Sequence, residues 1–219
     1  METVTEVRKE KESIDVLFVG SLVQATLGAF AIALSIIALA AMRLFLSAVA
    51  VIAIGASLLF EGGSIAYRFT RLLEQTSRGI MQGLEFGEGV SAEFIGGVAG
   101  IVLGILALLN IVPMILISVS AIVYGTALML GAGVTTRLNH LIIQGSNENE
   151  LSQKVARGAV TAAAGVQVFI GLAGATLGII GVVGIERMSL GLVAMLVLAF
   201  GRLLTGTALS NRMLYFIYK

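Results

Sequence analysis

The sequence predicts an all-α integral membrane protein with six transmembrane helices, on the basis of its composition, its long apolar stretches and an internal repeat. Hydrophobic residues make up 58% of the 219 residues and charged residues only 12%. The mean hydropathy is +1.01, whereas a soluble domain is about 25% charged. Such a chain cannot hide its apolar surface in water, but a bilayer accepts that surface because its core is apolar.

Six stretches are long enough to cross a bilayer, which takes about 20 mostly apolar residues. They form pairs, because the breaks at 42–43, 110–113 and 184–188 are very short, whereas the linkers 67–92 and 137–156 are longer and more polar. Pro113, the only proline, stands where a helix restarts, a position that proline tolerates. The predicted spans are 16–41, 44–66, 93–111, 113–136, 157–183 and 188–210.

The basic residues predict the orientation of the spans, because cytoplasmic loops are enriched in Lys and Arg. Most of them lie in the tails and the two linkers, and the tight turns hold only Arg43 and Arg187. We therefore expect both termini in the cytoplasm of a plasma (inner) membrane. Residues 1–15 have mixed charge and no cleavage-site pattern, so they are predicted to be a cytoplasmic tail before a single membrane domain over 16–219.

An internal repeat relates the three pairs of spans. A shift of 69 residues places the first pair on the second, and a shift of 74 places the second on the third. The repeats cover about 16–84, 85–155 and 156–219. Because each unit crosses the membrane twice, the three units are parallel, and a pseudo-threefold bundle of hairpins is the expected arrangement. Superposed positions include Leu34 with Leu103, Gly62 with Gly131, Gly100 with Gly174, and Gly104 with Gly178.

The second unit resembles a known family. Its stretch from Gly97 to Pro113 (GVAGIVLGILALLNIVP) and its stretch from Ala121 to Gly131 (AIVYGTALMLG) are similar to the two halves of the membrane repeat in HdeD-type acid-resistance proteins. The first and third units depart from this pattern, since they have Arg43 and Arg187 near the turn and no proline. The resemblance implies six spans in an inner membrane and a role in stress response, and it implies no catalytic residues.

Three polar residues are superposed by the repeat near the cytoplasmic start of the first span of each pair. They are Gln24, Glu93 and Gln167. If they face the bundle axis, they form a polar ring that could bind a proton or a small ion, because ionisable groups inside a membrane usually face protein or water. Alternatively, Glu93 lies at the membrane interface as an acid at a helix N-terminus, where the helix dipole stabilises it.

Arginines are superposed at the cytoplasmic ends of the second spans, where they complement the helix dipole and reach lipid headgroups. These are Arg68, Arg137 and Arg212. Arg202 lies about ten residues deeper than Arg212 and therefore needs a partner, a water pocket or a lipid headgroup. Glu61 lies at a similar level in the second span, so the sequence predicts an ion pair between Glu61 and Arg202.

Small residues form faces on the first span of two pairs, and such faces allow close helix packing in lipid. They are Gly96, Gly100, Gly104, Gly174 and Gly178. These faces either form a dimer contact or pack the first spans of the pairs against one another inside one chain. The triplication favours the second interpretation, with the first spans meeting at a central contact.

Several classes of function are not expected. The chain has no cysteine, which excludes thiolate chemistry, and it has only one histidine, which makes a His-based metal site improbable. The sequence also contains no phosphate-binding loop. The net charge of +1 gives no field to attract nucleic acid. We expect a non-enzymatic membrane protein without cofactors that acts as an accessory protein or complex subunit, by packing in the bilayer with copies of itself or other membrane proteins. The alternative is a channel or transporter for protons or small ions.

Overall fold

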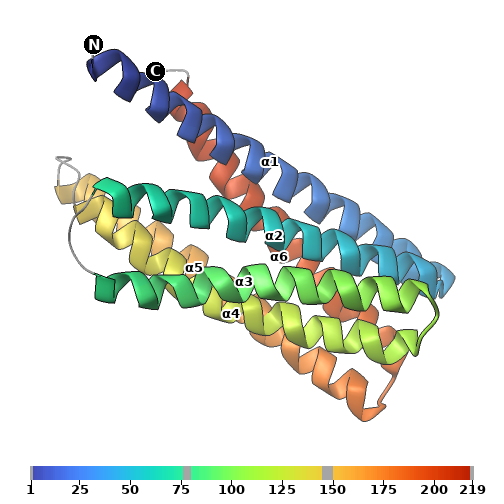
Figure 1. The fold of residues 1–219 in the computed structure, drawn as a ribbon. Coiled ribbons are helices and arrows are strands. Elements are labelled where there is room, and N and C mark those ends of the chain that lie inside the picture. Colours follow the sequence, from blue (N-terminus) through green and yellow to red (C-terminus); the bar gives the residue numbers. More distant parts are fainter. Residues whose placement is uncertain (1, 76–79, 145–149, 218–219) are drawn as a thin grey trace.

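The protein consists of six helices that form three antiparallel hairpins. The computed structural model describes the backbone of residues 2–75, 80–144 and 150–217, and the side chains of 19–20, 22–63, 92–133, 161–162 and 164–207. All three hairpin turns lie at one end of the molecule, and the chain termini lie at the other (Figure 1). The helices are α1 (Glu2–Ala41), α2 (Leu44–Gln75), α3 (Ile80–Leu108), α4 (Pro113–Gln144), α5 (Glu150–Val183) and α6 (Arg187–Ile217).

Apolar stretches of membrane-spanning length lie within these helices, and the chain is a multi-pass membrane protein. Five helices each carry an apolar stretch of 20 or 21 residues, and α3 carries a shorter one over Ala92–Leu108 within its described part. A helix suits the bilayer because it satisfies every backbone polar group internally. The five longer stretches are Leu22–Ala41, Leu44–Gly63, Pro113–Gly133, Ala164–Val183 and Arg187–Thr207.

The helices extend beyond the predicted spans at the end opposite the turns. The predicted linkers 67–92 and 137–156 are largely helical, because α2 continues to Gln75 and α4 to Gln144. The predicted tail 1–15 is also helical from Glu2 onward, as the first part of α1. At the turn end, α3 stops at Leu108, three residues earlier than the predicted span over 93–111.

The three hairpin turns begin in the same way, with one residue in the left-handed region after the first helix. That residue is Met42 (φ 50°), Asn110 (φ 62°) or Gly184 (φ 108°). In the first two turns, the following N–H donates to a carbonyl five residues earlier, from Arg43 to Ala38 and from Ile111 to Leu106, at 3.1 Å in each case. This Schellman arrangement satisfies a carbonyl that the helix end would leave unpaired.

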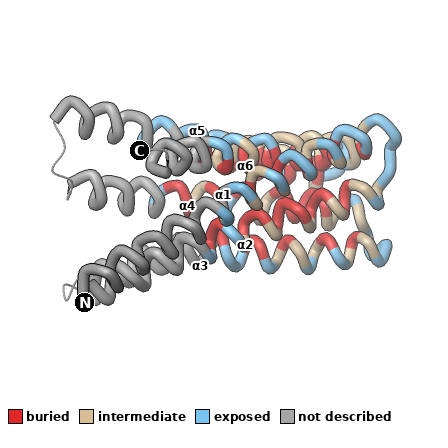
Figure 2. The backbone as a smooth tube through the Cα atoms, turned by 90° about the horizontal axis from the view of Figure 1, so that it is seen from above, coloured by how far each residue is buried: buried red, intermediate tan, exposed pale blue. Residues whose placement is uncertain are grey.

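The even-numbered helices form the inside of the bundle. The backbones of α2, α4 and α6 approach one another, whereas the backbone of each odd-numbered helix approaches only those of the two even helices beside it within the described residues. α1 also contacts α6, which closes the ring of helices. Buried positions follow this interior along the bundle, and the turns are mostly exposed (Figure 2). The apolar core therefore comes almost entirely from the even helices, with Val51, Ile54, Leu58, Ile117, Tyr124, Leu128, Met195 and Leu198 as its large members.

The expectation that the odd helices meet at a central contact is wrong. Their glycines instead receive side chains from even helices: a Cβ on Gly100 would overlap the Tyr124 ring, and one on Gly174 would lie 2.7 Å from Leu198 Cδ2. Gly96 lies against Ala127, Gly104 against Ile52, and Gly178 against Ile122. The physical reason is that the even helices carry the large side chains of the core, and these glycines leave room for them, as Gly100 does for Tyr124 and Gly174 for Leu198.

Candidate functional site: a buried polar cluster

Seven polar side chains meet at one level of the bundle. Glu93 lies 15 residues before the end of α3, and Arg202 lies 15 residues after the start of α6. At 1.5 Å per residue, both are about 22 Å from the turns along the helix. The seven residues, here called the polar cluster, are Gln24, Ser57, Glu61, Glu93, Gln167, Arg202 and Thr205.

Arg202 is the centre of the first part of the cluster. It is fully buried on α6 and forms an ion pair with Glu61 of α2. Its Nε donates to Ser57 Oγ at 3.1 Å, and its second terminal nitrogen donates to the Ser57 carbonyl at 3.2 Å. Ser57 and Glu61 are one helical turn apart and therefore lie on the same face of α2. Ser57 and Glu61 of α2 thus both bind the guanidinium group of Arg202. They are the partners that a buried arginine requires.

Glu93 and Gln167 form the second part of the cluster. The Gln167 amide donates to Glu93 Oε1 at 3.2 Å, which joins α5 to α3. Glu93 is only 1% exposed, and its Oε2 is buried without a hydrogen-bond partner. Gly131 of α4 lies against the Glu93 carboxyl group, because a Cβ at position 131 would overlap it. Glu93 therefore points into the protein, and it is not at a helix N-terminus, because α3 begins at Ile80.

Gln24 and Thr205 form the third part. The Gln24 amide donates to Thr205 Oγ1 at 2.8 Å, which joins α1 to α6. Thr205 in turn donates to the carbonyls of Gly201 and Arg202 on its own helix. The three residues of the predicted ring are thus all buried, but their bonds differ: Glu93 and Gln167 bond to each other, whereas Gln24 bonds to α6.

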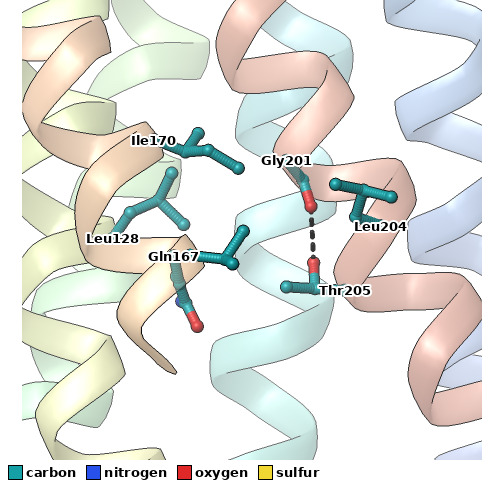
Figure 3. Close-up of a pocket in the computed structure, with 7 residues that line it drawn as sticks. Leu128, Gln167, Ile170, Gly201, Leu204 and Thr205 are labelled. Atoms are coloured by element: carbon teal, nitrogen blue, oxygen red, sulfur yellow. Dashed lines mark hydrogen bonds between the residues drawn. The ribbon is translucent and has the colours of Figure 1, made fainter. Parts of the chain in front are cut away.

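A small pocket lies between the second and third parts of the cluster. Gln167 from α5 and Thr205 from α6 are among the residues that line it (Figure 3). Its volume is about 10 Å³, which is room for one water molecule at most, and apolar side chains make up most of its lining. The described part of the chain contains no group of three or more His, Cys, Asp or Glu residues that could hold a metal ion.

Other predicted positions are distributed as follows. Arg68, Arg137 and Arg212 lie on α2, α4 and α6, and their side chains are outside the described residues. Ser57 and Thr205 also belong to the cluster but are not among the predicted site residues, although each lies one helical turn from a charged one, Glu61 or Arg202. Tyr124 was also missed: its hydroxyl donates to the Val51 carbonyl at 2.7 Å and joins α4 to α2. A tyrosine in the middle of an apolar stretch was the available signal, since a buried hydroxyl needs a partner.

Comparison with known proteins does not extend these findings. No protein-family model, curated protein or solved structure matches the chain. The resemblance to HdeD-type proteins therefore rests on the two stretches quoted from the second hairpin.

Proposed function

We propose that this protein is a non-enzymatic membrane protein that acts by packing in the bilayer, with copies of itself or with other membrane proteins, as an accessory protein or complex subunit. The observation that carries this proposal is the filled interior. Between the polar cluster and the turns, the centre of the described bundle is occupied by apolar side chains of the three even helices. The outer faces of the odd helices instead present large apolar side chains, including Val102 on α3 and Leu172 on α5. Those faces are the surfaces available to lipid or to a partner.

Crosslinking in native membranes tests this proposal, and the chain suits it because it has no cysteine of its own. A thiol-attached photocrosslinker is placed on an outer face by Val102→Cys or Leu172→Cys, with the buried Ala121→Cys as the matched control. We expect one outer position to give a discrete adduct with a second copy or with one repeatedly recovered membrane protein. Adducts with lipid alone from both outer positions would refute the proposal.

The arrangement in the membrane is part of the same proposal. We infer three tandem hairpin repeats around a pseudo-threefold axis, with both termini in the cytoplasm of a plasma membrane and with a role in stress response. The repeat is supported by Gly28, Gly97 and Gly171, which the alignment superposes. Each of them closely approaches an even helix of the neighbouring hairpin: Gly28 approaches α6, Gly97 approaches α2, and Gly171 approaches α4. Reaction of Ser189→Cys beside the third turn with a membrane-impermeant maleimide tests the orientation, and labelling only after the cells are opened would contradict it.

The second candidate function is translocation of protons or small ions through the polar ring of Gln24, Glu93 and Gln167. The observation that favours it is the unpartnered, buried Oε2 of Glu93. Purified protein in liposomes with an internal pH dye, under a pH gradient and a potassium diffusion potential, tests it directly. Protein-dependent proton entry that Glu93→Gln removes would support translocation. Entry no faster than in empty liposomes, with the inserted protein shown to be helical, would exclude it.

A further inference from the structure

The charges of the polar cluster do not balance. Glu61, Glu93 and Arg202 are all buried, so the cluster contains two carboxyl groups and one guanidinium. Arginine keeps its proton in proteins. With both acids ionised, the cluster would carry one net negative charge in apolar surroundings, and an uncompensated buried charge costs several kcal/mol. One additional positive charge at this level removes that cost.

The surroundings of the two acids indicate where that charge binds. Glu61 already has the guanidinium of Arg202 beside it. Glu93 receives a neutral amide at Oε1, and its Oε2 has no hydrogen-bond partner although it is buried. Around α3, the charged groups that act on Glu93 are Glu61 from α2 and Arg202 from α6. From α4, the nearest titratable side chain in the described core is Tyr124, whose hydroxyl is bonded to Val51.

We propose that Glu93 is a proton-binding site, in which Oε2 carries the one proton that balances the Glu61–Arg202 pair. A proton fits better than a metal ion, because no group of three or more acidic or histidine side chains is gathered in the described residues. Binding forms one O–H bond at Oε2 and leaves the Gln167 bond to Oε1 in place. No further reactant is needed, since the proton comes from water.

The depth of the cluster indicates the side from which the proton arrives. Glu93 is about 22 Å along α3 from the turn end. With the turns at one surface of a hydrocarbon core about 30 Å thick, about 8 Å remain to the opposite surface. The longer path is filled by apolar side chains of the even helices, including Leu58 and Met195. Exchange therefore occurs with water at the end that carries the chain termini. The site stands whether or not the protein conducts, because binding requires access from one side only.

Infrared spectroscopy of the purified protein in detergent or nanodiscs tests the site. The wild type should show a buried carboxylic-acid C=O band at neutral pH that shifts in D₂O, and Glu93→Gln should lack it. Glu61→Gln provides the sharper test: the remaining Glu93 and Arg202 then balance each other, so this variant should also lose the band. A band that persists unchanged in Glu93→Gln, or its absence from the wild type at neutral pH, would overturn the proposal.

A second measurement does not depend on the folding of a variant. When wild-type protein is unfolded by detergent in unbuffered solution at neutral pH, the Glu93 carboxyl enters water and should release about one proton per chain. No release would overturn the proposal. Adding sodium chloride at constant pH distinguishes a bound proton from a bound metal ion. The carboxylic-acid band should not change; loss of the band with sodium chloride but not with choline chloride would identify a sodium site instead.

Discussion

The crossing of α4 and α5 allows a sharp test of how the hairpins pack, through Gly125→Ala. A Cβ on Gly125 would lie 2.6 Å from the backbone nitrogen of Ala175 and still closer to the carbonyl oxygen of Gly171. Both atoms belong to the backbone of α5, so no change of side-chain rotamer can make room. The two helices would have to move apart at this contact.

The expected magnitude follows from two opposing effects. Overpacking of this kind costs about 1–3 kcal/mol, whereas replacing glycine by alanine within a helix stabilises it by about 0.5–1 kcal/mol. Gly133→Ala is the matched control, because it lies on the same helix and a Cβ there has no atom within 4 Å. The helix-propensity gain is common to both variants, so the difference between them isolates the crossing and should be about 1–3 kcal/mol.

Equilibrium unfolding in mixed micelles with increasing sodium dodecyl sulfate, followed by circular dichroism, measures this difference. Gly125→Ala should unfold at a lower detergent fraction than the wild type, and Gly133→Ala at the same or a higher fraction. If Gly125→Ala is as stable as Gly133→Ala, the close approach of α4 and α5 is refuted.

Three further predictions use the same unfolding assay. Met42→Gly should stabilise the protein by about 1 kcal/mol, because Met42 adopts a left-handed φ of 50° that glycine adopts freely. The exposed Ala33 lies inside α1, so Ala33→Gly should instead destabilise the protein by about 0.5–1 kcal/mol. Tyr124→Phe should cost about 1 kcal/mol for one lost hydrogen bond, and an unchanged midpoint would contradict the contact. Arg202→Met should lower the free energy of unfolding by about 3–5 kcal/mol, because it leaves Glu61 buried without its ion-pair partner. The double variant Arg202→Met with Glu61→Leu should lower it clearly less, because neither charge remains.

The helices and turns were the most predictable features of this protein. Apolar length fixes where a bilayer helix can lie, and breaks as short as Met42–Arg43 leave room only for a hairpin. The packing of the hairpins was less predictable, because a glycine face indicates that another helix packs closely there but does not identify that helix. Gly100 shows this: the sequence predicts that its small-residue face packs against another odd helix, but in the structure it contacts the ring of Tyr124 from α4. The size complementarity that decides the partner exists only in three dimensions.

The polar positions show the same division. The positions of Glu61 and Arg202 along their spans could be read from the sequence. They predicted that the two residues lie at a similar level and form an ion pair, and the structure contains this pair. The superposition of Gln24, Glu93 and Gln167 predicted a shared level but not their partners. Side-chain length and the local backbone decide those partners: Gln24 reaches Thr205 on the adjacent α6, whereas Glu93 and Gln167 meet although α3 and α5 do not contact each other through their backbones.

The contacts between side chains of the cluster share one property, which is that they join different hairpins. Gln24 and Thr205 join the first to the third, Arg202 and Glu61 join the third to the first, and Glu93 and Gln167 join the second to the third. Lipid chains are as apolar as the helix surfaces, so apolar burial does little to select one arrangement of hairpins, whereas a buried polar group left without its partner penalises every other arrangement. The cluster thus favours this arrangement of hairpins, and a proton on Glu93 would act at a polar contact between the second hairpin and the third.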